Sequence, residues 1–285
     1  IERRNDSLAS LFDPQIAQQK ASKLDTFFKS LQKNTGFNGT VLVSQYGKVI
    51  YKQAFGVANK FTNDKLSTKT AFQLASVSKQ FTAVSILQLV EKGKISLEDR
   101  VEQHIPGFPY DSSITIRSLL THKSGLADYT FSLDKYYDKK TPLTSAKVVE
   151  MMIDIKPGID YRPNKAFHYN NTNYMLLAYI VERLSGKDFR SYVKENIFIP
   201  AGMTESFIYD PQHPELLKKS ATGYVPKGNG SVVANFDHLD GVTGDKGIYS
   251  TVEDMFLWDQ ALNNEKVVKL SSLEQAFTPQ HTKPK

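Results

Sequence analysis

The sequence of 285 residues contains no cysteine. Disulfide bonds, thiol catalysis and cysteine-based zinc or iron–sulfur sites are therefore excluded, although the redox state of the compartment stays open. The six histidines show no paired spacing such as His-Glu-x-x-His, which disfavours a zinc hydrolase. No Gly-x-Ser-x-Gly occurs either, which disfavours the triad of α/β-hydrolases. We therefore expect no metal and no cofactor.

Long apolar runs are also missing. No run approaches the roughly 20 residues that a membrane-spanning helix needs, so we expect no transmembrane segment. The net charge is +6, but the lysines are spread along the chain without a compact basic patch, so we expect no nucleic-acid partner. With 40% hydrophobic residues, the chain can bury the core of one large or two medium domains. It starts at Ile1 and not Met, which predicts a processed N-terminus whose leader has been removed.

The stretch 72–93, FQLASVSKQFTAVSILQLVEKG, predicts a buried helix with Ser76 and Lys79 near its start. Residues three apart on a helix are neighbours, so the serine hydroxyl and the lysine amine can form a hydrogen bond. A serine hydroxyl is a weak nucleophile until a base takes its proton, and a lysine can be that base if burial makes it lose its own proton. The positive end of the helix dipole would also face an anion that develops at the serine.

Ser-x-x-Lys occurs more than once, so context has to select among the pairs. The four pairs are Ser30/Lys33, Ser76/Lys79, Ser132/Lys135 and Ser191/Lys194. Only Lys79 is followed by a nearly continuous apolar run, whereas the other three lysines lie in strongly polar surroundings. A charged residue is seldom placed in an apolar environment without a partner or a task. The alternative is a lysine that extends from the helix end into solvent.

The rest of the chain predicts an α+β fold. Residues 39–44 and 48–55 are β-rich runs around a glycine-containing turn, which is typical of an antiparallel hairpin. An amphipathic helix is expected before them, through Leu24 and Leu31, and others at 116–122, 146–155, 173–184, 189–196, 252–262 and from 271. The predicted N-caps are Thr115, Thr144 or Ser145, and Ser250 in a capping box with Glu253. Little strand is expected between 72 and 202, which indicates a mostly helical region inserted between parts of an antiparallel sheet.

A second candidate group lies at Tyr169-Asn170-Asn171, just before the helical pattern at 173–184. Among the 14 tyrosines, only Tyr169 is followed two residues later by asparagine. A phenol beside an ammonium loses its proton more easily, and it can then act as a base toward a serine or as an acid toward a leaving group. Asn171 offers an amide that can hold the lysine and a substrate amide. Alone, Tyr-x-Asn is more often a hydrogen-bonding feature of a loop.

Together these motifs resemble the serine β-lactamase and penicillin-binding-protein superfamily, in its class C-like branch with D-Ala-D-Ala carboxypeptidases and esterases. The resemblance covers nearly all of the chain from Gly36 onward. It rests on Ser76-Val-Ser-Lys79, Leu97-Glu-Asp-Arg-Val101 with Ile105-Pro106, Leu119-Leu-Thr-His-Lys-Ser-Gly-Leu126, Pro157-Gly158, Phe167-His-Tyr-Asn-Asn171, Pro200-Ala-Gly-Met203, and Gly244-Asp-Lys-Gly-Ile-Tyr-Ser-Thr251 with Glu253-Asp254. Several blocks in order are far more specific than any one of them.

The resemblance implies a role for each candidate residue. Ser76 would be the acylated nucleophile, Lys79 its proton acceptor, and Tyr169 a general base or acid. Asn171 would bind and orient the substrate, and the backbone N–H of Ser76 would form half of the oxyanion hole. His122, at a helix end, is expected to be structural, and His168 is expected to pack or position its neighbours.

The resemblance also divides the chain into three parts. Residues 1–75 would form the N-terminal helix and hairpin of an α/β domain, 76–215 the nucleophile helix and a mostly helical domain, and 216–285 an incomplete return to the α/β domain. One family motif is missing, a Lys- or His-x-Gly on a later strand that supplies the second oxyanion N–H; His281-Thr-Lys283 lacks the glycine and comes too early. Either the sequence is a fragment without the closing strands, or the protein is a non-hydrolytic relative. The retained motifs favour the fragment.

The leading hypothesis is a serine hydrolase that forms a covalent acyl-enzyme with an amide or ester: a D-Ala-D-Ala peptide, a β-lactam or a small ester. The alternative is a non-catalytic peptide- or cell-wall-binding relative. The partner in either case is a small molecule or a peptide, and specificity is expected in loops such as 128–141 and 205–235. The sequence does not indicate an oligomeric state. The resemblance implies a periplasmic or secreted location in a bacterium.

Overall fold

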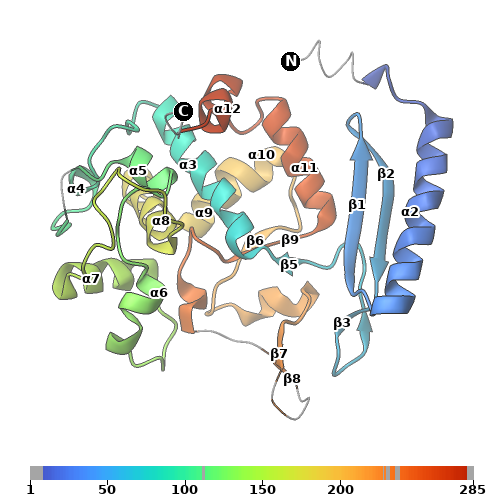
Figure 1. The fold of residues 1–285 in the computed structure, drawn as a ribbon, viewed down its shortest axis with the longest axis horizontal. Coiled ribbons are helices and arrows are strands. Elements are labelled where there is room, and N and C mark those ends of the chain that lie inside the picture. The colour runs from blue at the N-terminus through green and yellow to red at the C-terminus, as the bar shows by residue number, and fades with distance from the viewer. Residues whose placement is uncertain (1–8, 111–112, 227, 229–231, 235–237, 281–285) are drawn as a thin grey trace.

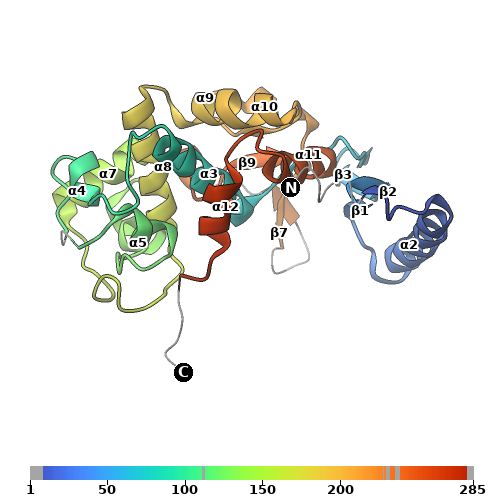
Figure 2. The same ribbon diagram turned by 90° about the horizontal axis from the view of Figure 1, so that it is seen from above.

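The computed structural model describes residues 9–110, 113–226, 228, 232–234 and 238–280. His281-Thr-Lys283 and positions 227, 229–231 and 235 of the 205–235 loop lie outside the described residues. Figure 1 shows a hairpin with one long helix at one end of the molecule and a group of helices at the other, and Figure 2 shows the same separation from above. The division of the chain into parts 1–75, 76–215 and 216–285 stays a prediction.

The first end of the molecule is built as the sequence predicts. Helix α2 (Pro14–Thr35) begins at Asp13, whose carboxylate accepts the N–H groups of Gln15 and Ile16. Strands β1 (Gly39–Gln45) and β2 (Lys48–Phe55) pair antiparallel, with Gly39 opposite Phe55. Tyr46 and Gly47 turn the chain with φ of 53° and 73°, the left-handed values that a tight hairpin turn needs. The predicted hairpin is confirmed.

A three-stranded antiparallel sheet lies at the centre, and its individual strands were not predicted. It has the order β5-β9-β6, from β5 (Phe72–Gln73), β9 (Ile248–Ser250) and β6 (Phe207–Ile208). Strands of two or three residues are too short to show an alternating pattern, which is why they were missed. Two further pairs are β3 (Val57–Asn59) with β4 (Asp64–Lys65), and β7 (Tyr224–Pro226) with β8 (Val232–Ala234). Between β5 and β6 the described residues form no strand, so the inserted helical region is confirmed.

Except at some ends, the longer helices agree with the predicted ones, whereas three short helices, at Val101–His104, Tyr129–Ser132 and Ile199–Ala201, were not predicted. In chain order, the helices are α3 (Lys79–Glu91), α4 (Val101–His104), α5 (Ile116–Leu120), α6 (Tyr129–Ser132), α7 (Ser145–Ile155), α8 (Asn171–Ser185), α9 (Phe189–Val193), α10 (Ile199–Ala201), α11 (Val252–Asn263) and α12 (Leu270–Phe277). Thr115 and Thr144 cap α5 and α7. The predicted cap Ser250 is wrong, because Thr251 accepts the N–H of Asp254 at the start of α11. Helix α5 stops before His122, whose φ of 55° is left-handed. No helix in the described part of the chain is both long and apolar enough to span a bilayer.

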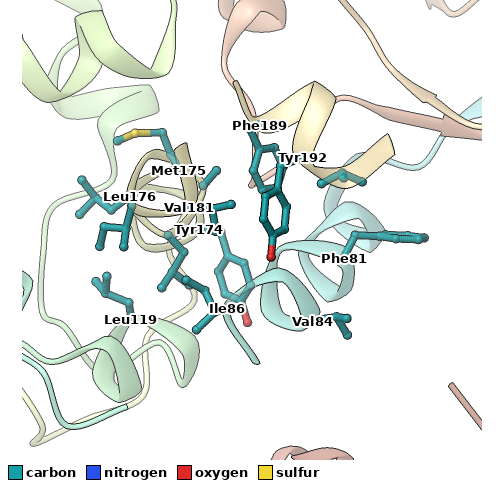
Figure 3. Close-up of a cluster of buried hydrophobic side chains, with 14 of the residues drawn as sticks. Phe81, Val84, Ile86, Leu119, Tyr174, Met175, Leu176, Val181, Phe189 and Tyr192 are labelled. Atoms are coloured by element: carbon teal, nitrogen blue, oxygen red, sulfur yellow. The ribbon is translucent and has the colours of Figure 1, made fainter. Parts of the chain in front are cut away.

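The core lies where α3 meets α8. Figure 3 shows side chains of α3, α5, α8 and α9 converging there, and those of Phe81, Ile86 and Val181 are completely buried. The same cluster contains Leu119, Met175, Leu176 and Phe189, all fully buried. Helix α3 is apolar on nearly every side, so it must be enclosed by other elements. The first turns of α3 and α8 are thereby held at a fixed separation.

The backbone of Gly244 packs directly against α8, at Tyr174 and Ala178. It has a φ of 96°, and a Cβ built there would lie 2.4 Å from the Cβ of Ala178 and 2.4 Å from the carbonyl oxygen of Tyr174. Its own carbonyl accepts the hydroxyl of Thr82 on α3 at 2.7 Å. The segment around Gly244 therefore bridges α3 and α8 only while this residue has no side chain.

We predict that Gly244→Ala lowers the free energy of unfolding by about 3 kcal/mol, through steric overlap and an unfavourable φ. Urea denaturation followed by circular dichroism measures this change. Gly223→Ala is the control, since a Cβ at Gly223 meets no atom within 4 Å. Equal losses in the two variants would contradict the close approach at Gly244.

Candidate active site

Ser76 sits where the chain passes from a strand to a helix. Strand β5 leads into the 3-10 turn η1 (Ala75–Ser78), and α3 continues from it without a break. Ala75 has a φ of 47°, a left-handed value that is unfavourable for alanine and that often occurs at functional sites. The turn is anchored to β9, because the N–H of Leu74 donates to the carbonyl of Ile248 at 2.8 Å. Ser76 itself is exposed at the start of α3.

Lys79 lies one turn further on, and only 6% of it is exposed. Its Nζ donates to Ser76 Oγ at 3.2 Å, to Asn171 Oδ1 at 2.9 Å and to the backbone oxygen of Asp245 at 2.8 Å. The amine also lies 4.8 Å from the centre of the Tyr169 ring. The alternative that Lys79 extends into solvent is wrong. The lysines of the other three Ser-x-x-Lys pairs, Lys33, Lys135 and Lys194, are exposed.

Tyr169 and Asn171 reach the same place from the beginning of α8. The hydroxyl of Tyr169 donates to Ser76 Oγ at 2.6 Å, although the two residues are 93 positions apart. Asn171 is the first residue of α8, two residues before the predicted start. The structure therefore brings all four candidate residues, Ser76, Lys79, Tyr169 and Asn171, into one hydrogen-bonded group. Their catalytic roles stay predictions.

Asp128 completes the group, and the sequence did not identify it. Its Oδ2 accepts both the backbone N–H of Asn171 at 2.9 Å and the side-chain amide of Asn171 at 3.1 Å. Its Oδ1 caps α6 by accepting the N–H of Thr130 at 3.0 Å and the hydroxyl of Thr130 at 2.6 Å. In the sequence, Asp128 is one polar residue at the start of a polar loop. The one sequence signal near it is the family-like motif Leu119–Leu126, which ends two residues before Asp128.

Asp245 is a second residue that the sequence did not identify. It is 2% exposed, and its Oδ2 accepts the hydroxyl of Tyr129 at 3.0 Å. Among the described residues, no partner reaches its Oδ1. Burial raises the pKa of Asp245 to about 6, against the opposing effect of the positive charges of Lys246 and Lys79. The carboxylate of Asp245 therefore stays mostly ionised at pH 7 and takes up a proton as the pH falls through about 6.

His122 supports the phenol from behind. Its Nδ1 accepts the N–H of Asn170 at 3.1 Å, and its ring lies 4.7 Å from that of Tyr169 and 5.0 Å from that of Tyr174. Burial lowers the pKa of His122 to about 4, and the charge of Lys79 adds to this effect. The imidazole is therefore neutral at pH 7. These contacts agree with the structural role expected for His122. His168 packs its ring at 4.8 Å from that of Tyr161, in agreement with the packing role expected for it.

Within the described ranges, no three histidine, aspartate or glutamate side chains are grouped so as to hold a metal ion. The arrangement offers a hydroxyl group, an amine and a phenol within hydrogen-bonding distance of it, and a buried imidazole that is neutral at pH 7. This chemistry is suited to the transfer of an acyl group to Ser76.

Comparison with known proteins identifies the family. A family model described as Beta-lactamase matches residues 24–285. The chain belongs to the beta-lactamase family. This confirms the predicted family, and a solved relative confirms the α+β fold. The structure of an octameric penicillin-binding protein homologue from Pyrococcus abyssi matches this chain with a TM-score of 0.78 at 28% identity, over 92% of this chain and 61% of that one.

Two curated relatives are similar along almost the whole chain. A penicillin-binding protein of Bacillus subtilis (strain 168) is 37% identical over 274 residues, which cover 93% of this chain and 60% of the relative. A teichoic acid D-alanine hydrolase of Staphylococcus aureus is 27% identical over 285 residues, which cover 100% of this chain and 66% of the relative. The beta-lactamase-family chain described here thus spans about three-fifths to two-thirds of the length of these relatives.

The neutral state of His122 predicts a pH dependence of stability. As the pH falls from about 6.5 to about 4, the unfolded chain binds a proton at His122 that the folded protein does not. The wild type should therefore lose on the order of 3 kcal/mol over this interval relative to His122→Asn. Asparagine tolerates the left-handed backbone, and its Oδ1 can replace Nδ1 as acceptor for Asn170.

Urea denaturation of both proteins at several pH values between 4 and 7 measures the difference. His168→Asn, which removes an exposed imidazole, is the control. If the curves for the wild type and His122→Asn run parallel across the interval, His122 is not the neutral buried group described above.

Proposed function

We propose that the protein is a serine hydrolase that works through a covalent acyl-enzyme on an amide or an ester. The observation that carries this proposal is the convergence of Lys79 Nζ and Tyr169 Oη on Ser76 Oγ, at 3.2 and 2.6 Å. A hydroxyl that is hydrogen-bonded to both an amine and a phenol has a proton acceptor and a proton donor at hand. The family membership and the hydrolase name of one relative support the same class of reaction.

The proposed reaction begins when Ser76 Oγ attacks the carbonyl carbon of the substrate. The proton of Ser76 passes to the neutral amine of Lys79 or to a deprotonated Tyr169, and the new C–O bond forms a tetrahedral intermediate. The C–N or C–O bond to the leaving group then breaks, and Tyr169 or Lys79 returns the proton to that group. Water hydrolyses the resulting ester in a second passage through the same steps. Asn171 keeps one amide hydrogen that is free to meet a substrate carbonyl, because only one of its two points at Asp128.

The substrate class proposed is a D-Ala-D-Ala peptide, a β-lactam or a small ester. One relative is named for binding penicillin and another for hydrolysing teichoic acid D-alanine, which supports a reagent of this kind. Hydrolysis of a D-Ala-D-Ala peptide, a cephalosporin and a short-chain ester should be measured side by side. The periplasmic or secreted location stays a prediction.

We predict that a fluorescent penicillin or an activated ester labels the protein at Ser76. Intact mass and peptide mapping identify the acylated residue, and Ser76→Ala should abolish the label because no other hydroxyl has the same two partners in the proposal. Ser30→Ala, which alters another Ser-x-x-Lys pair, should label like the wild type. A label that survives Ser76→Ala would refute the assignment. Reversible binding of these reagents without any label would favour the non-catalytic binding relative.

We predict that Tyr169→Phe slows acylation of Ser76 by about 10²- to 10⁴-fold, since it removes the group proposed to exchange protons with Ser76. The fold should not change, because Tyr169 is 45% exposed and its hydroxyl bonds only to Ser76 among the contacts described. Stopped-flow measurement of labelling gives the rate. Tyr161→Phe, at an exposed tyrosine on the same segment, is the control. Wild-type labelling by Tyr169→Phe would exclude Tyr169 from the reaction.

A further inference from the structure

The carboxylate of Asp128 determines which way the side-chain amide of Asn171 points. An ionised carboxylate can only accept hydrogen bonds, and Asp128 Oδ2 lies 3.1 Å from Asn171 Nδ2. The nitrogen of the amide must therefore face Asp128, which leaves Asn171 Oδ1 on the opposite side, 2.9 Å from Lys79 Nζ. The backbone N–H of Asn171, which donates to the same oxygen at 2.9 Å, keeps the two residues together.

Asp128 is itself held in place from both sides. Its second oxygen accepts two hydrogen bonds from Thr130, which fixes the rotation of the carboxylate. The next residue, Tyr129, donates its N–H to Thr172 Oγ1 at 2.8 Å, and the Thr172 hydroxyl donates to the carbonyl of Ala127 at 2.8 Å. The start of α6 and the first turn of α8 are thus joined on either side of the contact between Asp128 and Asn171. The carboxylate cannot turn away without breaking these bonds.

This arrangement has a consequence for the amine. Asn171 Oδ1 and the backbone oxygen of Asp245 are both acceptors only, and both lie within 3 Å of Lys79 Nζ. The ammonium form of Lys79 donates to Ser76 Oγ as well as to these two oxygens. Once it has lost a proton for the acylation step, the neutral amine has two N–H bonds and one lone pair, and both hydrogens stay directed at these two oxygens. The lone pair must then point along the remaining direction, in which Ser76 Oγ lies at 3.2 Å.

We propose that Asp128 is a positioning residue for the acylation step, which acts through Asn171 to aim the lone pair of Lys79 at Ser76. The inference rests on the proposed function. In this step the O–H bond of Ser76 breaks, its proton joins the lone pair of Lys79, and Oγ forms its bond to the acyl carbon. The ammonium that results has three hydrogens and passes one of them to the leaving group. With the amide of Asn171 reversed, its NH₂ group would face the amine and the lone pair would be drawn away from Ser76.

Two substitutions separate this role from the capping of α6. Asp128→Ser keeps a good N-cap for Thr130 but is too short to reach Asn171. Asp128→Asn keeps the size of the side chain. Its NH₂ group is a donor where the carboxylate oxygen was an acceptor, so it favours the reversed side-chain amide of Asn171, with Oδ1 facing residue 128. We expect the rate of Ser76 acylation at saturating penicillin to fall by about 10- to 100-fold in both variants, with little change in the concentration that gives half-saturation. Asp138→Asn, at an exposed carboxylate of the same loop, should keep the wild-type rate.

A second measurement does not depend on activity. In ¹⁵N-labelled protein, exchange of the Asn171 side-chain amide hydrogens with solvent should be at least about tenfold faster in Asp128→Ser than in the wild type, because a hydrogen bond is lost. The resonance is assigned by its disappearance in Asn171→Asp. A slower acylation rate with unchanged exchange would mean that Asp128 acts only through the fold, and this overturns the inference.

The outcomes distinguish the two proposals. If penicillin acylates the wild type and Asp128→Ser equally fast, the positioning role is overturned while the proposed function stands. If no reagent acylates Ser76 in the wild type, the proposed function fails and the positioning role fails with it. A loss of rate in both Asp128 variants, together with faster amide exchange and no loss in Asp138→Asn, supports the inference.

Discussion

The burial of one amine, Lys79 Nζ, is the constraint on which the arrangement depends. Removing an ammonium from water costs several kcal/mol unless its hydrogens find acceptors. The three acceptors come from η1, from the first residue of α8 and from the backbone of Asp245. Because these segments are far apart in the sequence, the amine acquires its partners only when α3, α8 and the segment before β9 are all in place. The same packing that stabilises the core therefore assembles the candidate site.

Three titratable side chains, His122, Asp245 and Asp128, surround the amine of Lys79. Burial lowers the pKa of His122 to about 4, so its imidazole is neutral near pH 7, and it raises the pKa of Asp245 to about 6, which leaves that carboxylate mostly ionised there. The charge of Asp128 is compensated by its four hydrogen bonds. A charge that develops at Ser76, whose side chain is exposed, interacts with solvent as well as with the dipoles of the buried groups behind it.

The sequence predicts the local features of this protein better than the distant ones. The spacing of Ser76 and Lys79 implies their contact directly, because a helical turn places residues three apart side by side. The pairing of Tyr169 with Ser76 rested on the resemblance, since no local rule joins residues 93 positions apart. Asp128 and Asp245 could not be found, because they act through bonds to residues 43 and 116 positions away. The central strands were too short to show a period.

The left-handed backbone at Ala75, described above, has a consequence for the neighbouring hydroxyl. Glycine would enter this conformation without strain, yet it would also let the chain leave it, because glycine samples far more backbone angles. The methyl group of alanine raises the free energy of the left-handed turn, and it also reduces the range of backbone angles that the turn can sample. Alanine at this position therefore lowers the stability of the turn but restricts its backbone. The position of the neighbouring Ser76 Oγ is restricted with it.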